Sequence, residues 1–386
     1  MLAQLNIPST VIIGGGARHQ LVPQLQRLAA RRALLVTDAF MVKNGVAGST
    51  HEDLQTAGIE ATVFADVQPD PTVGNVMDGL GELNRVGADV VIALGGGSPM
   101  DAAKAIAVLA TNPPPLAQYS GYHKIPRAGL PLVAIPTTAG TGSEVTKVAV
   151  ITDTERDVKM MILDAHLLPR VALVDYELSL TMPAALTAHV GVDTLTHGIE
   201  AFVSRKASAL TDPLALACIR LVAENLPTAY REPSNHAARE AMMTAACLGG
   251  MAFANSSVCL VHGMSRPIGA HFHVAHGLSN AVLLPTVTRY SLPGATERYA
   301  TVARTAGAAS DTDSETAAGQ ALVEYLEGLN RDLAVGRFRD AAKVDQANFE
   351  SKLTAMAEAA LASGSPQNNP IVPAIDEMVA LYRQAW

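Results

Sequence analysis

The feature that most constrains the fold of this chain is a change of pattern near residue 180. Before that point, short runs of β-branched and aliphatic residues alternate with helical stretches, and residues 90–94 are wholly apolar. Such runs are typical of strands that are buried on both faces of a parallel sheet. After that point, strand-like runs become scarce and Ala- and Leu-rich helical periodicity dominates. We therefore expect an α/β domain over residues 1–180 and an all-α domain over residues 181–386.

Composition limits the classes of partner. The chain has 386 residues, too many for one compact core, and its 49% hydrophobic and 17% charged residues can bury a large interior. Its net charge of -8, without any Lys/Arg-rich block, argues against nucleic acid and anionic membrane surfaces as partners. We therefore expect a small-molecule substrate.

One segment raises the question of a membrane span. Residues 241–261 carry no formal charge over a length that could cross a bilayer. They nevertheless contain Thr244, a Gly-Gly pair and Asn255, and they lack flanking anchor residues. We expect a buried helix that crosses its neighbours closely, and no membrane contact.

The N-terminus and the cysteines bear on location. The first residues lack the basic and apolar regions of a secretory signal. The three cysteines, Cys218, Cys247 and Cys259, are an odd number in apolar surroundings, which indicates reduced buried thiols. These features predict a cytoplasmic protein.

A glycine loop follows the apolar run at residues 90–94. Gly95-Gly96-Gly97-Ser98 precedes a helix expected over residues 102–109, with Ser98 as its N-cap and Asp101 three residues later. Glycines let the backbone approach a phosphate, and a helix N-terminus supplies unpaired amides. A plain strand-to-helix turn is the alternative, and the G-x-G-x-x-G spacing is absent. We favour a diphosphate-binding loop, because ligands of open α/β sheets lie at the carboxyl ends of strands.

Two further polar groups follow predicted strands. The loop at residues 136–144 carries Thr137, Thr138 and Thr141, whose hydroxyls can donate to phosphate or ribose; taken alone, a polar surface loop is an equal alternative. Asp38 ends another strand, where a carboxylate can accept hydrogen bonds from ribose hydroxyls and repel a 2'-phosphate. An aspartate in an ordinary strand-end turn is equally plausible there. Together these groups favour NAD over NADP.

Four side chains have the chemistry of metal ligands. Asp193 and His197 lie four residues apart on an apolar helix, so they share one face. Alone, such a pair is more often a capped or salt-bridged couple than a metal site. His262 and His276 bound a segment that holds four of the protein's eleven histidines, with Pro267 and glycines that let it turn. One oxygen and three nitrogens suit Fe(II), Zn(II) or another divalent first-row ion, and the sequence does not choose among them.

These motifs resemble those of the iron-containing (group III) alcohol dehydrogenases, the family of lactaldehyde reductase and 1,3-propanediol dehydrogenase. The resemblance covers essentially the whole chain. The matching segments are Gly95-Gly96-Gly97-Ser98 with Asp101, Pro136-Thr137-Thr138 through Glu144, Met182-Pro183, Gly191-x-Asp193-x-Leu195-x-His197, and His262-Gly263-Met264 through His276-Gly277-x-x-Asn280. It implies a dehydroquinate synthase-like architecture, an active site between the two domains, and homodimers or larger homo-oligomers.

The resemblance also implies roles for single residues. It places the metal, Fe(II) above Zn(II), on Asp193, His197, His262 and His276. It places the diphosphate on Gly96, Gly97 and Ser98 and counts Asp101 of the same motif among the cofactor-binding residues. It also lines the nucleotide cleft with Thr137, Thr138 and Thr141 and sets Asp38 near the adenosine ribose. Lys159 would reach the nicotinamide ribose, unless it is an ordinary exposed strand lysine. The implied reaction is reversible hydride transfer between a small primary alcohol and NAD.

The chain departs from the family pattern at one position that matters for proton transfer. Many relatives carry a second histidine four residues after the position matched by His262, where this chain has Arg266. An arginine stays charged near neutral pH and cannot act as a general base. It could bind an anionic substrate tail or brace the loop, and we favour the second. The proton would then leave through ribose hydroxyls and water, or through His271 or His273.

Two rival interpretations remain at this point. One is a zinc-dependent enzyme similar to glycerol dehydrogenase, or another enzyme of the same superfold. The other, more remote, is a non-catalytic nucleotide or metal sensor, which would require a disrupted ligand set. The complete set of four ligands favours the alcohol dehydrogenase.

Overall fold

The computed structural model describes residues 3–156, 158–342 and 345–386. The chain divides into two compact units. One is Asn6–Ser179, and the other is Leu180–Trp386 together with the N-terminal residues as far as Leu5. The first is an α/β unit and the second is helical, which confirms the predicted fold class.

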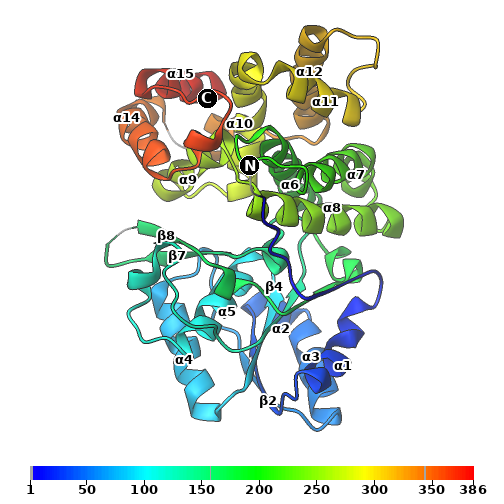
Figure 1. Ribbon diagram of the computed structural model, residues 1–386, viewed down its shortest axis with the longest axis vertical. Coiled ribbons are helices and arrows are strands. Elements are labelled where there is room, and N and C mark those ends of the chain that lie inside the picture. Colours follow the sequence, from blue (N-terminus) through cyan, green and yellow to red (C-terminus); the bar gives the residue numbers. More distant parts are fainter. Residues whose placement is uncertain (1–2, 157, 343–344) are drawn as a thin grey trace. The chain divides into compact units, whose positions relative to one another are not determined.

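The α/β unit is built on a six-stranded parallel sheet (Figure 1). Its strands lie in the order β1-β9-β6-β4-β2-β3. Their bounds are β1 Thr10–Ile13, β2 Arg32–Val36, β3 Glu60–Phe64, β4 Val90–Gly95, β6 Leu132–Pro136 and β9 Val171–Val174. A smaller sheet joins β5 Gly121–Tyr122, β8 Val158–Leu163 and β7 Val148–Asp153 in that order.

Helices cover both faces of the large sheet, which explains why its inner strands are apolar throughout. Side chains alternate along a strand, so Val91 and Ala93 pack in one core and Val90 and Ile92 in the other. The first core includes residues of α4 and α5, and the second includes residues of α1 and α3. The helices of this unit are α1 Leu21–Arg27, α2 Ala39–Lys43, α3 Val46–Thr56, α4 Val73–Val86 and α5 Gly97–Leu109, with short 3-10 turns η1 Ala17–Gln20, η2 Leu116–Tyr119, η3 Ser143–Val145, η4 Ala165–Leu167 and η5 Tyr176–Ser179.

The strand order places a topological switch point between β2 and β4. The strand after β2 in the chain, β3, lies on its far side, whereas the strand after β4 in this sheet, β6, lies on the opposite side. Ligands of open α/β sheets bind outside the carboxyl ends of the strands at such a point. The segments that follow β2, β4 and β6 are therefore the places to look for a nucleotide.

The second unit consists of helices among its described residues. The bounds are α6 Ala184–Val203, α7 Asp212–Arg231, α8 His236–Asn255, α9 Leu260–Phe272, α10 His276–Ser291, η6 Leu292–Gly294, α11 Thr296–Thr305, α12 Glu315–Asp332, α13 Phe338–Ala342, α14 Gln346–Ala362, η7 Pro366–Asn368 and α15 Ile375–Ala385. Glycines allow the first three to cross closely. A Cβ on Gly191 of α6 would collide with the side chain of Leu226 of α7, and one on Gly249 of α8 would lie 3.0 Å from the sulfur of Cys218.

The uncharged segment at residues 241–261 forms two helices. It runs along α8, breaks after Asn255 and continues into α9, so the prediction of a single buried helix is wrong in its extent. The close crossing at Gly249 agrees with the expected packing. Among the described residues, no single helix is long and apolar enough to cross a membrane; α8 and α9 meet that test as a pair, bent by 102° at their break.

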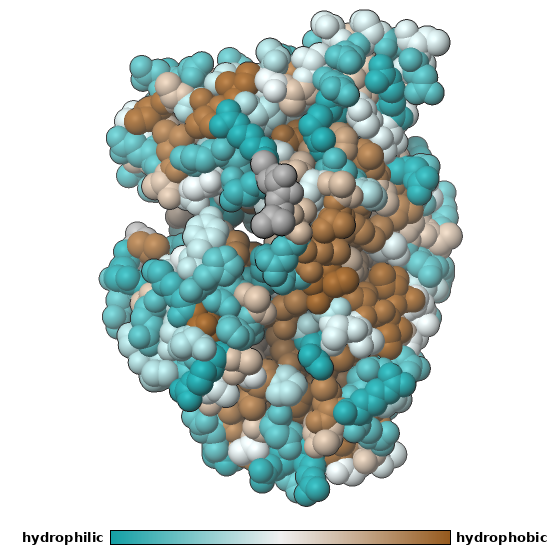
Figure 2. Space-filling view, in the orientation of Figure 1, coloured by the Kyte–Doolittle hydropathy of each residue, from teal (hydrophilic) through white to brown (hydrophobic). Residues whose placement is uncertain are grey.

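Hydrophobic residues also reach the surface. Figure 2 shows them among hydrophilic residues on the face in view. Large exposed hydrophobic side chains include Phe40 and Val42 of α2, which are 56% and 48% exposed. The hydrophobic content of the chain is thus not wholly taken up by its cores.

Candidate metal centre and nucleotide loops

Helix α6 carries the first two predicted metal ligands. Asp193 and His197 lie one turn apart, and both are buried. The hydroxyls of Thr194 and Thr196 donate back to the carbonyl oxygens of Val190 and Val192, so these threonines are satisfied within the helix. The carboxylate and the imidazole are therefore held in an apolar helix that is buried over its last three turns, where their charge needs a partner.

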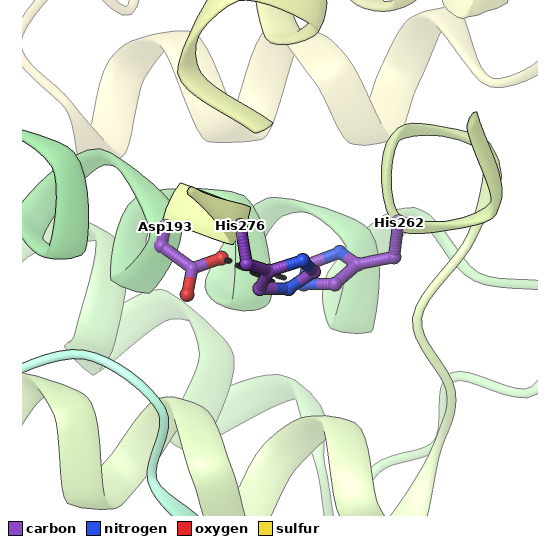
Figure 3. Close-up of side chains that lie close together, drawn as sticks. All are labelled: Asp193, His262 and His276. Carbon is purple, nitrogen blue, oxygen red and sulfur yellow. Dashed lines mark ion pairs between the residues drawn. The ribbon is translucent and has the colours of Figure 1, made fainter. Parts of the chain in front are cut away.

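The structure brings three ligands from three helices to one point. One ligand atom from each of Asp193, His262 and His276 lies within 4.8 Å of the other two. Figure 3 shows the Asp193 carboxylate directed at the two imidazole rings. The distances from Asp193 Oδ1 are 3.5 Å to His262 Nε2 and 3.9 Å to His276 Nε2.

The fourth predicted ligand adjoins this group. His197 Nε2 lies 3.9 Å from Asp193 Oδ1, and the His197 ring stacks against the ring of His262 with centroids 4.7 Å apart. It also stacks against Phe253 at 4.3 Å. All four predicted ligands thus lie in one cluster, with three of them converging most tightly.

The side chain of Asn280 tests whether the cluster suits a cation. Its Nδ2 donates to Asp193 Oδ1 at 2.6 Å and lies 3.2 Å from Nε2 of both His262 and His276. The electropositive amide group of Asn280 thus faces the three candidate ligand atoms at once. The buried Oδ1 of Asn280 has no hydrogen-bond partner among the described residues. A donor set of one carboxylate and several imidazoles fits a divalent first-row metal ion.

The electrostatics of the cluster favour an ionised carboxylate. Burial alone would raise the pKa of Asp193, but the imidazoles of His197, His276 and His262 hold it well below its ordinary value. Burial would lower the pKa of His262, yet Glu200 and Asp193 raise it to about 9. Without a metal, the His262 imidazole therefore keeps a proton that balances the neighbouring carboxylates.

Glu200 is a buried carboxylate that sequence reasoning missed. Its Oε2 lies 2.6 Å from His262 Nδ1, on the side of the ring opposite to the cluster. A signal was present, because Asp193, His197 and Glu200 fall at positions i, i+4 and i+7 and share one helix face. Asn280 belongs to the last of the matching motifs, and the sequence predicts no role for it.

The predicted proton-relay residues lie on the turn that leads to His276. His271 is in the last turn of α9, and His273 follows as its C-cap with a left-handed backbone (φ 53°); both side chains are exposed. Arg266 is partly buried, and its Nη1 donates to the hydroxyl of Ser365 at 2.9 Å. That contact links α9 to the segment before η7.

In the α/β unit, the glycine loop and the threonine loop lie against each other. The amide of Thr137 donates to the carbonyl oxygen of Gly95. A Cβ on Gly96 would lie 3.4 Å from Thr138 Cγ2, and one on Gly97 would lie 3.0 Å from Thr141 Cγ2. A side chain at Gly97 would crowd the threonine loop, so glycine at this position allows the two loops to approach closely.

The helix after the glycine loop starts earlier than predicted. It begins at Gly97, with Gly96 as N-cap and without any side-chain cap, so the predictions of a start at residue 102 and of Ser98 as N-cap are wrong. Pro99 is compatible with this earlier start, because the first turn of a helix does not need the amide hydrogen that proline lacks. The free amides of the first turn therefore belong to Gly97 and Ser98.

Asp38 and Lys159 take different positions. Asp38 is the N-cap of α2, where its Oδ1 accepts from the amide of Met41, and its Oδ2 lies 3.5 Å from where a Cβ on Gly95 would be. It therefore stands beside the glycine loop at the switch point. Lys159 lies on β8, with its Nζ 2.8 Å from Oδ1 of Asp70.

Asp101 belongs to a buried polar network beneath the two loops. Its carboxylate accepts from the hydroxyl of Ser143 and from the amide of Val150. Lys104, which is fully buried, donates to Ser143, Thr146 and the carbonyl oxygen of Val148. Both carboxylate oxygens of Asp101 are thus engaged within the protein, where they tie α5 to the segment after the threonine loop.

Glu144 gives this network a pH dependence that can be measured. Burial raises its pKa from 4.5 to about 7, against its own backbone amide and Lys104, which lower it. The folded state therefore binds this proton more tightly than the unfolded state, and the associated stability is lost as the pH rises through about 7. At pH 8 the raised pKa of Glu144 lowers the free energy of unfolding by about 3 kcal/mol relative to acidic pH.

The substitution Glu144→Gln removes this titration. At each pH we compare the melting temperature of the variant with that of the wild type. We expect this difference, variant minus wild type, to increase by several degrees from pH 5 to pH 8. Differential scanning calorimetry in both buffers measures it, with the exposed Glu155→Gln as control. A difference that does not change with pH would contradict the prediction.

Comparison with known proteins agrees with this geometry. The family model described as iron-containing alcohol dehydrogenase matches residues 8–176, and the one for the C-terminal part of the Fe-containing alcohol dehydrogenase family matches residues 187–386. The chain belongs to the iron-containing alcohol dehydrogenase family. This confirms the predicted family and the oxidoreductase class, and it does not favour the glycerol dehydrogenase-like alternative.

Individual relatives match over nearly the full length. The 1,3-propanediol dehydrogenase of Klebsiella pneumoniae is 38% identical, over 98% of this chain and 98% of its own. The NAD-dependent methanol dehydrogenase of Bacillus methanolicus is 35% identical over the same shares. A crystal structure of 1,3-propanediol oxidoreductase superimposes with a TM-score of 0.97 at 38% identity, with both chains fully covered. The predicted iron and NAD cofactors agree with the family and with the NAD dependence of a relative.

Proposed function

We propose that this protein catalyses reversible hydride transfer between a small primary alcohol and NAD, with a divalent metal ion as cofactor. The observation that carries the proposal is the convergence of buried Asp193 with His262 and His276. The paired glycine and threonine loops at the carboxyl ends of β4 and β6 support the nucleotide part.

The residues proposed to hold the metal are Asp193, His197, His262 and His276. A divalent ion bound there, Fe(II) before Zn(II), supplies a Lewis acid for the hydroxyl group of the alcohol. The chain contributes one negative charge from Asp193, and the burial of Asp193, His197 and His262 strengthens electrostatic interactions with a bound ion. Ser265 holds His276 through a hydrogen bond of 3.1 Å between its hydroxyl and Nδ1.

The nucleotide is proposed to lie on the α/β unit. The amides of Gly97 and Ser98 at the start of α5 suit its diphosphate, and Thr137, Thr138 and Thr141 offer hydroxyls from the neighbouring loop. Asp38 suits a ribose without a 2'-phosphate, which favours NAD over NADP. NAD supplies the hydride acceptor in alcohol oxidation. We propose that Lys159 reaches the nicotinamide ribose after it leaves Asp70.

The site is proposed to release its proton through ribose hydroxyls and water, or through His271 or His273. The exposure of both histidines on the turn before His276 supports their access to solvent. The pH profile of kcat in His271→Ala and His273→Ala tests this route. If the pH profiles of both variants match that of the wild type, the proton does not leave through His271 or His273.

Arg266 is proposed to brace α9 rather than to select the substrate. Its bond to Ser365 supports this role. We expect Arg266→Leu to lower the melting temperature by a few degrees, since a hydrogen bond from a charged donor contributes about 1.5–3 kcal/mol. The ratio of kcat/KM for 1-propanol to that for 3-hydroxypropionate should stay within about threefold of the wild type. A selective loss of more than tenfold toward the anionic alcohol would show that Arg266 binds the substrate tail.

One experiment tests the whole proposal. The protein is purified without oxygen, its metals are quantified, and reduction of NAD and NADP is followed with C2 to C4 alcohols, diols and anionic analogues. We expect one divalent ion per chain and a preference for NAD. The absence of turnover with any metal and coenzyme would overturn the proposed function.

We further propose that the enzyme acts in the cytoplasm as a homodimer or larger homo-oligomer. Cys218, Cys247 and Cys259 are all buried thiols, which suits a reducing compartment. The exposed Phe40 and Val42 of α2 supply apolar surface of the kind that subunit contacts cover. Light scattering after size-exclusion chromatography measures the oligomeric state.

A further inference from the structure

The buried carboxylate of Glu200 is surrounded by donors from one short segment. It lies on α6, 3% exposed. Its Oε1 accepts from the amide of Val261 at 2.6 Å, and its Oε2 accepts from the amide of Cys259 at 2.8 Å. The third donor is Nδ1 of His262, 2.6 Å from Oε2. Its ion-pair partner in the described part of the chain is this histidine.

Glu200 thereby caps α9 from another helix. The N-cap of α9 is Cys259, and it makes no side-chain capping bond. The two amides that Glu200 binds belong to this N-cap and to the second helical residue. A carboxylate at a helix N-terminus compensates unpaired amides and the helix dipole. Glu200 therefore fixes where α9 begins, and with it the position from which His262 projects.

The same carboxylate selects the tautomer of His262. A carboxylate at hydrogen-bond distance from Nδ1 requires a proton on that nitrogen, because an ionised carboxylate can only accept. In the neutral imidazole, Nε2 then carries the lone pair. Nε2 is the atom that faces the cluster, 3.5 Å from Asp193 Oδ1. A neutral hydroxyl, such as that of Ser265 beside His276, can either donate or accept and imposes no such choice.

We propose that Glu200 is a positioning residue of the metal site, which holds the ring and the tautomer of His262 so that Nε2 is presented to the metal. This inference rests on the proposed metal site at Asp193 and the histidines. Partners that orient a ligand in this way usually contribute a factor of about 10–100 to metal affinity.

Binding of Co²⁺ to metal-free protein measures this contribution directly, without reference to turnover. The probe is Co²⁺ itself, titrated into chelator-treated wild type and Glu200→Gln and followed by its visible absorption. We expect the variant to bind Co²⁺ about 10–100-fold more weakly. An affinity within threefold of the wild type would overturn the proposal. Wild-type protein that binds no Co²⁺ would instead contradict the metal site itself, and the role of Glu200 with it.

A matched control separates positioning from general loosening of the segment. Asn368 Nδ2 donates to the hydroxyl of Ser257 and the carbonyl oxygen of Val258, so it holds the same segment without touching His262. We expect Asn368→Ala to lower the melting temperature yet leave the affinity for Co²⁺ within threefold of the wild type. Equal loss of affinity in both variants would show that order of the segment, rather than Glu200, is responsible.

The tautomer can be read in the wild type, in case Glu200→Gln does not fold. Long-range proton–nitrogen spectra of Zn²⁺-loaded protein with ¹⁵N-labelled histidine distinguish a protonated Nδ1 from a protonated Nε2. We expect His262, assigned by comparison with His262→Gln, to carry its proton on Nδ1. A protonated Nε2 would overturn the proposal.

Discussion

Asp193→Asn is expected to weaken metal binding by more than about 100-fold and to lower NAD-linked alcohol oxidation in parallel. This loss exceeds the factor of about 10–100 expected when only a partner that orients a ligand is removed. The substitution keeps the size of the side chain and removes its negative charge, which lies close to the ring nitrogens of His262 and His276. A neutral amide oxygen is a far weaker partner for a divalent ion than a carboxylate, and the buried setting increases the difference.

Metal quantification and Co²⁺ titration measure the effect of Asp193→Asn, and NADH fluorescence shows whether the nucleotide still binds. A suitable control is Asp175→Asn, since Asp175 is also fully buried but accepts from the amides of Gly16, Arg18 and Glu177 in the α/β unit. We expect this control to lose stability and keep its metal. An Asp193→Asn variant that retains metal at wild-type affinity would place the metal elsewhere.

The fold was predictable where one pattern has one physical cause. Residues 90–94 are apolar because both faces of β4 are covered, which is visible in a single sequence. The start of α5 was not predictable in this way, because the preference of serine for N-caps is local and was overridden here. The first helical residue, Gly97, is set by a long-range contact instead, because a Cβ there would lie 3.0 Å from Thr141 Cγ2. The break after Asn255 did have a marker, because Asn255-Ser256-Ser257 is a polar cluster of the kind that separates helices, but the absence of charge was given more weight.

The convergence of the candidate ligands was predictable from the sequence, and the side chains that support them were less so. The spacing of Asp193 and His197 and the density of histidines after residue 261 identify metal chemistry from residue types alone. Glu200 shares their helix face, yet nothing in the sequence shows which amides it will meet. Those amides lie about sixty residues further along the chain, as the separations in their hydrogen bonds show. Residues that orient a ligand therefore become visible only in the packed structure, whereas candidate ligands can be recognised from their spacing in the sequence.

Gly97→Val is expected to weaken binding of NADH by about 10–100-fold while leaving the metal in place. A Cβ at this position would already lie 3.0 Å from Thr141 Cγ2, and the two methyl groups of valine would extend further toward the threonine loop. The loops must then separate, which withdraws amides from the diphosphate; a hydrogen bond to a charged group contributes about 1.5–3 kcal/mol. Each 1.4 kcal/mol is a factor of ten in affinity.

Fluorescence titration of NADH measures this loss, and Gly81→Val provides the matched control. Gly81 lies on the exposed face of α4, where a Cβ meets no atom within 4 Å, so the same change of residue should leave NADH affinity within twofold. Co²⁺ affinity should be unchanged in both variants, because Asp193 and the histidines belong to the other unit. If Gly97→Val binds NADH as tightly as the wild type, the diphosphate does not lie on this loop, and the glycines serve only the packing of the two loops against each other.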